Sequence, residues 1–324
     1  MVGDTPATRD RILTMAMKLT NFYRISVMSV AALLTLTQGA FLFAQTPKES
    51  PVQLVRETVY NENKATNGGA KFMFLDRRET AHGSQTKLMV ETNQATAGIL
   101  IAVNGKPLAA DQRQSEDARL NNLANSPDEL KKKQKAERDD SRRTARIVQA
   151  LPDAFIFEPD GTEPGRQGVG YPGDELVRLK FRPNPRYSPP SHTEQVLTGM
   201  QGYLLIDADK HRIAKIDGTL FKDVGFGWGI LGRLDKGGRF LVEQGCIDGK
   251  DWEPTRMDLS FTGKELLFKA ISIKSSEVMS DFRPVPENLS FSQGVELLKK
   301  QSTELAENHA ENRGDKEVQK LDPK

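Results

Sequence analysis

Four histidines and one cysteine are the residues of this chain that could serve as general bases, metal ligands or nucleophiles near neutral pH. His82, His192, His211 and His309 lie far apart, and none stands four residues from another or in a His-Glu-x-x-His motif. A helical zinc site needs that spacing, because residues four apart share a helix face. Cys246 has no neighbouring histidine, and no Gly-x-Ser-x-Gly motif is present. The sequence therefore predicts no metal site, no cofactor and no catalytic centre.

A glycine-rich segment, Gly-Trp-Gly-Ile-Leu-Gly at residues 227–232, matches the dinucleotide-binding motif Gly-x-Gly-x-x-Gly. The motif binds a pyrophosphate only where a strand leads into a helix. Here the next residues, 235–239, are typical of a turn and a strand, so we interpret the match as coincidental and expect a bent strand or loop. Asp207-Ala-Asp209 lacks the later glycine and glutamate of a calcium loop and is interpreted as a hairpin turn.

The first 44 residues have the three parts of a secretory signal peptide. Four basic residues precede an apolar segment at residues 25–44, and a small residue, Ala44, comes directly before Gln45. An uncleaved membrane anchor is the alternative, since about 20 apolar residues can span a bilayer. Threonine and glutamine within the segment favour cleavage. We expect a periplasmic or secreted protein that meets a membrane only through this segment or transiently.

Charge is balanced over the whole chain and concentrated in one segment. With 46 Lys and Arg against 44 Asp and Glu, the net charge is +2, which predicts no nucleic-acid partner. Residues 107–150 are rich in charges of both signs, including Lys131-Lys132-Lys133. They are interpreted as solvated helices, broken at Ser126-Pro127, that form an insertion projecting from the main domain.

The remaining chain reads mainly as strands. Residues 52–60 have helical spacing, and alternating segments rich in β-branched and aromatic residues follow. The predicted strands are 71–77, 85–92, 98–103, 154–157, 175–181, 202–207, 212–216, 238–243, 255–261 and 265–273. We expect an α+β fold: an open, curved antiparallel sheet, in effect an incomplete barrel, with helices on its concave face. It forms a single domain over residues 45–290, followed at 291–324 by a helix and a disordered tail.

Aromatic side chains recur on nearly every predicted strand. They can fill an ordinary core, but a curved sheet can also leave an apolar cavity where a hydrophobic ligand binds. The candidate lining residues are Phe72, Phe74, Tyr203, Phe226, Trp228, Phe240 and Phe268.

Five short segments occur in an order that resembles one known superfamily. They are a Gly-x-hydrophobic-hydrophobic-Asp strand, a hairpin strand, a Gly-Phe strand, an Asp-Gly…Trp-x-Pro hairpin and a closing Asp-Phe-Arg, at residues 202–207, 212–216, 236–240, 247–254 and 280–284. The order resembles the LolA-like periplasmic lipoprotein carriers, moderately over 200–284 and weakly over 52–103. The resemblance implies an incomplete β-barrel, with helices lining its concave face, that binds acyl chains or an unfolded partner segment. The charged segment 107–150 departs from the compact carriers.

Two functions of different classes follow. The first is an exported, non-catalytic envelope protein that binds a lipid or acyl ligand or an acylated partner such as a lipoprotein. The second is a periplasmic protein-interaction or regulatory module that docks an envelope partner through the 107–150 helices. A hydrolase ranks third, because no nucleophile and base can be paired.

Overall fold

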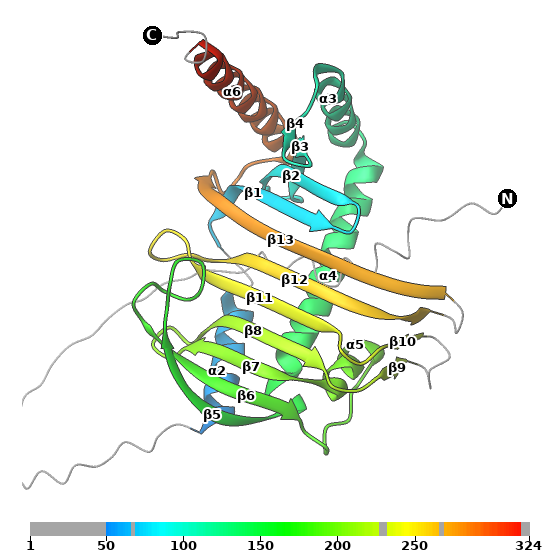
Figure 1. Cartoon of the computed structure of the whole chain (residues 1–324), viewed down its shortest axis with the longest axis vertical. Helices are drawn as coiled ribbons and strands as arrows, with labels where there is room; N and C mark the ends of the chain where they lie inside the picture. Colours follow the sequence, from blue (N-terminus) through cyan, green and yellow to red (C-terminus); the bar gives the residue numbers. More distant parts are fainter. Residues whose placement is uncertain (1–49, 66–68, 227–231, 266–268, 319–324) are drawn as a thin grey trace, which may run out of the picture.

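The computed structural model describes residues 50–65, 69–226, 232–265 and 269–318, with side chains up to residue 307. The expected signal segment and two candidate residues, Trp228 and Phe268, lie outside the described residues. Within them the fold is α+β, as predicted: five helices accompany a large, open antiparallel sheet that is not closed into a barrel (Figure 1).

The sheet is one continuous antiparallel path with a small side branch. Its order is β4-β3-β2-β1-β13-β12-β11-β8-β7-β6-β5, and β10 pairs with both β12 and β9. The strands are β1 (Lys71–Thr80), β2 (Gly83–Val90), β3 (Ala97–Val103), β4 (Lys106–Pro107), β5 (Phe155–Pro164), β6 (Glu175–Pro183), β7 (Met200–Asp207), β8 (Arg212–Leu220), β9 (Val224–Phe226), β10 (Gly232–Leu234), β11 (Arg239–Cys246), β12 (Trp252–Glu265) and β13 (Lys269–Val285).

One predicted strand is wrong. Residues 265–273 were expected to run straight, but β12 ends at Glu265 and β13 begins at Lys269, with these two residues paired across the reversal. The same apolar pattern suits either side of a hairpin, because both sides present alternate residues to one face. The last strand, β13, then pairs with β1 and joins the N-terminal hairpins to the rest of the sheet (Figure 1).

Helices cover both faces of the sheet. The helices are α2 (Pro51–Ala65), α3 (Ala110–Ala124), α4 (Pro127–Ala154), α5 (His192–Gln195), which continues into the 3₁₀ turn η1 (Val196–Gly199), and α6 (Phe291–Val318). Helices α2, α4 and α5 pack against what we call the inner face, whereas α3 and α6 pack against the other side of β1–β3, the outer face.

Register distinguishes the two faces, because directly paired residues share a face. Val242 pairs with Met257, Met257 with Glu277, and Glu277 with Arg78, which carries the inner face across to β1. Met73 lies an odd number of residues from Arg78 and so faces outward, where it packs with α3 and α6.

The charged segment forms two helices that break where expected. The Ser126 side chain accepts a hydrogen bond from the Glu129 backbone N–H at 3.4 Å, and Pro127 occupies the first helical turn. The segment is helical, as expected, and its apolar residues pack against the sheet. Leu120 of α3 is fully buried against β2 and β3, and Ile147 and Val148 of α4 pack against the cluster on the inner face.

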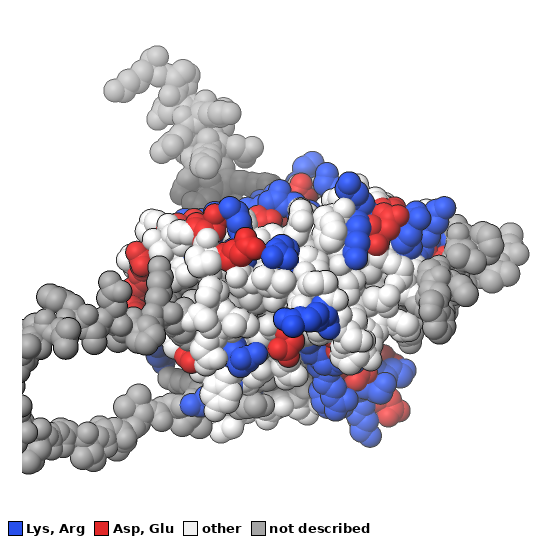
Figure 2. Space-filling view, turned by 90° about the horizontal axis from the view of Figure 1, so that it is seen from below, with Lys and Arg blue, Asp and Glu red and all other residues white. Residues whose placement is uncertain are grey.

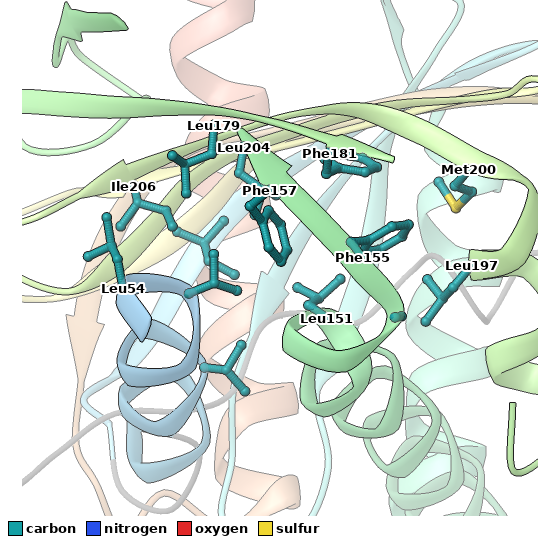
Figure 3. Close-up of a cluster of buried hydrophobic side chains, with 14 of the residues drawn as sticks. Leu54, Leu151, Phe155, Phe157, Leu179, Phe181, Leu197, Met200, Leu204 and Ile206 are labelled. Atoms are coloured by element: carbon teal, nitrogen blue, oxygen red, sulfur yellow. The ribbon is translucent and has the colours of Figure 1, made fainter. Parts of the chain in front are cut away.

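The largest buried cluster lies between the inner face and helices α2 and α4. Figure 3 shows Leu54 of α2 and Leu151 of α4 beneath side chains of β5, β6 and β7, among them Phe157 and Ile206. Burial of these side chains supplies the main stabilising free energy, about 25 cal/mol per Å² of apolar surface removed from water.

Candidate functional site: an apolar cavity on the inner face

A cavity of about 440 Å³ lies beside this cluster, between α4, the α5–η1 segment and strands β8 and β11–β13. Its lining is almost wholly apolar. The volume falls within the roughly 300–1,000 Å³ that ligand pockets usually have.

One wall of the cavity is made only by strand side chains. Val242, Met257, Leu259 and Ile273 pack with one another, and the partly buried residues around them also belong to strands. All four line the cavity. No helix residue belongs to this cluster among the described residues, so its surface away from the sheet is left for another occupant.

The opposite wall comes from the charged segment. Leu151 of α4 lies four residues after Ile147 and three after Val148, a spacing that puts all three on one side of the helix. All three line the cavity. The charges of α4 lie along the rest of its surface, where Lys135 meets Asp139 at 3.4 Å between Nζ and Oδ2. The amphipathic helix thus turns an apolar stripe toward the sheet and most of its charges toward water, while the buried Asp140 pairs with Arg143.

A few polar residues also line the cavity. They come from α4, α5, β10 and β12: Thr144, His192, Thr193, Arg233, Lys264 and Glu265. Arg233 and Lys264 pair directly and alternate with the inward-facing Leu234 and Glu265, so their side chains point to the outer face. The ring nitrogen Nδ1 of His192 lies 3.3 Å from Oε1 of Gln195, one turn along the same short helix.

The structure places some of the predicted lining residues in the cavity and others elsewhere. Phe226 of β9 and Phe240 of β11 both line the cavity. Tyr203 faces outward instead: along β7 its neighbour Leu204 belongs to the inner cluster, whereas Tyr203 packs with Leu205 on the other side. The Arg178 guanidinium lies 3.8 Å above the partly buried Tyr203 ring in a cation–π contact on this outer face.

Phe72 and Phe74 face inward but belong to a different cluster. They pack with Met279 and Phe282, and the rings of Phe74 and Phe282 stack with centroids 5.2 Å apart. Neither phenylalanine lines the cavity. Trp228 and Phe268 lie outside the described residues.

Sequence reasoning missed the aliphatic side chains that make most of the cavity, such as Ile147, Met257 and Ile273. A signal for the α4 wall exists, because Ile147, Val148 and Leu151 have helical spacing within a polar segment. No local signal distinguishes the strand wall from an ordinary core.

The groups that could do chemistry lie apart from one another. Cys246 is buried on the outer face, and burial raises the pKa of its thiol, which keeps it in the less reactive protonated form. Within the described residues, no group of three or more His, Cys, Asp or Glu side chains is placed to hold a metal ion. Strands β9 and β10, on either side of the glycine-rich motif, pair antiparallel through Phe226 and Gly232, so a strand follows the motif.

Charges of both signs lie side by side on the surface. Figure 2 shows this for the face seen from below, where basic and acidic residues alternate. Along α4, Lys133 pairs with Glu137 at 3.1 Å and Lys132 with Glu129 at 2.6 Å. Other charges of α4 pair outside the helix, as Arg146 does with Glu194 of α5 at 2.8 Å.

Comparison with known proteins finds no relative: the chain matches no protein-family profile, no curated protein and no solved structure. Among the described helices, none combines the length and the apolar character that crossing a membrane requires.

Proposed function

We propose that this protein is an exported, non-catalytic binding protein that holds an acyl chain, free or attached to a partner, in the inner-face cavity. The observation that carries the proposal is the strand wall formed by Val242, Met257, Leu259 and Ile273. It faces an apolar cavity, and none of the helix residues that the structure describes packs into this cluster. The signal-like segment and the resemblance to LolA-like carriers support it.

The physical basis is desolvation. An acyl chain placed against this wall is removed from water, at about 0.8 kcal/mol for each buried CH₂ group. A chain of a dozen such groups would therefore bind without any hydrogen bond or catalytic group. The side chains of the strand wall also gain dispersion contacts with the acyl chain, which they lack when the cavity is empty.

The direct test is to purify the protein from an envelope fraction and to extract bound lipid for mass spectrometry. Delipidated protein is then titrated with dodecanol by calorimetry. We expect a co-purified acyl compound and saturable binding of dodecanol.

A cavity-filling variant makes the test specific. Val242→Phe adds a ring inside the cavity, so it should abolish dodecanol binding while leaving the melting temperature near or above that of the wild type. Val278→Phe is the matched control: Val278 is 41 % exposed on the outer side of β13, and the same change there should leave binding intact.

Absence of bound lipid together with no dodecanol binding would overturn the proposal. The interaction module that docks through α3 and α4 would then be the better hypothesis. Retention of dodecanol binding by Val242→Phe would place the binding site elsewhere and would equally contradict the proposal.

A further inference from the structure

The open sheet has two edges, and one of them, β5, is protected by its own sequence. Pro159 and Pro164 have no backbone N–H to offer a further strand, and the acidic side chains of Glu158 and Asp160 lie on the same strand. Its register with β6 also shifts between Pro159 and Thr162. Prolines, charges and irregular pairing each hinder the addition of another strand. Strand β5 is therefore a poor site for pairing with a second chain.

The opposite edge has none of these features. Strand β3 reads Ala-Gly-Ile-Leu-Ile-Ala-Val and contains no charge and no proline. The short strand β4 pairs with it only at Ala102 and Val103, which leaves residues 97–100 as the outermost part of the sheet. An uncharged edge strand rich in β-branched residues is a template for another strand. This part of β3 is protected only if something else covers it.

Helix α3 covers this part of β3 with side chains. The Leu100 backbone N–H donates to the Glu116 carboxylate at 3.3 Å, and the Arg119 guanidinium donates to the Gly98 carbonyl at 2.8 Å. Glu116 and Arg119 also form an ion pair with each other. Gly98 and Leu100 lie two residues apart, so these are the backbone groups that a neighbouring strand would bind. Figure 1 shows α3 at the same end of the sheet as β3 and β4.

Few contacts hold α3 in this place. Leu120 is the only buried side chain among the described residues of the helix, and the Arg119 side chain is 50 % exposed. Water can replace the hydrogen bonds of Glu116 and Arg119 once α3 moves away. A competing strand therefore has to displace one buried leucine and two polar side chains.

We propose that α3 is a displaceable cover, and that the β3 edge beneath it binds the β3 edge of a second copy of this chain. The two strands pair antiparallel about a two-fold axis, which makes one continuous sheet across the dimer. Identical uncharged strands bring no like charges together, so nothing electrostatic opposes the pairing. The assembly ends at the dimer, because the edge left at each end is the protected strand β5.

The experiment removes the cover and measures the oligomeric state. The double variant Glu116→Ala with Arg119→Ala and the wild type are compared by sedimentation equilibrium across a range of concentrations, with circular dichroism to confirm folding. Loss of the two edge hydrogen bonds should lower the dimer dissociation constant by about tenfold or more. The matched control is Glu129→Ala with Lys132→Ala. This pair has the same charges three residues apart on α4, with side chains 55 % and 72 % exposed, and its loss should leave the dissociation constant at the wild-type value.

Hydrogen exchange locates the interface. In the double variant, exchange of the Leu100 amide should slow as the protein concentration rises and the dimer forms. A folded double variant that dimerises no more tightly than the wild type overturns the proposal, and so does a dimer in which the Leu100 amide gains no protection. Should the double variant fail to fold, Arg119→Ala alone retains the Glu116 contact and should shift the dissociation constant less, in the same direction. An unchanged constant in that variant also overturns the proposal.

Discussion

Glu62 of α2 and Arg212 of β8 form a buried ion pair, with 2.9 Å between Oε1 and Nε, although they lie 150 residues apart. Pairing of β8 with β11 ends at Lys215 and Glu243. Beyond this pair, the Glu62 carboxylate lies between the two strands and bonds to both. It also accepts hydrogen bonds from the Ile213 backbone N–H and the Gln244 side chain, each at 2.9 Å. One carboxylate thus holds α2 against the inner face.

Replacing Glu62 should therefore be costly. Glu62→Leu leaves the Arg212 guanidinium buried without its partner, and we expect a loss of about 3–5 kcal/mol in the free energy of unfolding. Adding Arg212→Met to this variant should recover much of the loss, since the uncompensated charge is gone. Glu57→Leu on the same helix is the control, because the Glu57 side chain is 43 % exposed and contacts Gln53 and His211 at the surface. Chemical denaturation measures all three; a cost equal to that of the control would contradict the role of the pair.

A second buried pair makes stability depend on pH. Burial, and then the nearby Asp76 carboxylate, raise the pKa of Glu277 from its ordinary 4.5 to about 8. The folded protein keeps a proton on this pair that the unfolded chain releases, so the contribution to stability is full below about pH 4.5 and is lost as the pH rises toward 8. Glu91, whose pKa burial raises to about 8, contributes in the same direction.

Glu277→Gln should weaken this pH dependence. Glutamine donates a hydrogen bond to Asp76 at every pH, so the fall in unfolding free energy between pH 5 and 8 should be smaller, by up to about 1.4 kcal/mol per pH unit where the pair titrates. Glu79→Gln on β1, with its side chain 64 % exposed, is the control. An identical slope in the wild type and Glu277→Gln would show that Glu277 does not hold the extra proton.

Two phenylalanines that look alike in the sequence should behave differently. Phe240→Ala enlarges a cavity that already exists, so it should weaken acyl binding at a cost below that of a packed phenylalanine. Phe74→Ala breaks the stack with Phe282 in a filled cluster and should cost about 3–5 kcal/mol without changing ligand affinity. Calorimetric titration and thermal unfolding of both variants provide the comparison. The cavity assignment fails if the effects are reversed.

Export is tested on the protein in cells. We expect the mature chain to begin near Gln45 and to be recovered in the periplasmic or secreted fraction, because the apolar segment ends in a small residue. Intact-mass measurement of fractionated protein shows the N-terminus directly. Recovery of the uncleaved chain in the membrane fraction would instead support an anchor.

Local pattern was enough to predict most of the strands and the break between α3 and α4. Alternation of apolar and polar residues is a property of each strand alone. Ser126 and Pro127 start a helix through a cap and a first-turn proline, which does not depend on where the helix packs. The same reasoning failed at residues 265–273, because a hairpin reversal changes direction without changing the pattern.

The cavity could not be predicted in this way. Phe240 and Phe74 lie on equally apolar strands, yet only the order of the strands and the path of α4 determine which of them meets open space. The sequence alone determined the fold class, the helical nature of the charged segment and the expectation of export, because these depend on neighbouring residues. Only the tertiary structure decided that β13 pairs with β1, that α4 becomes a wall of the cavity, and that Lys264 lies opposite Arg233. These relationships join residues distant in the chain, and packing, rather than local preference, selects them.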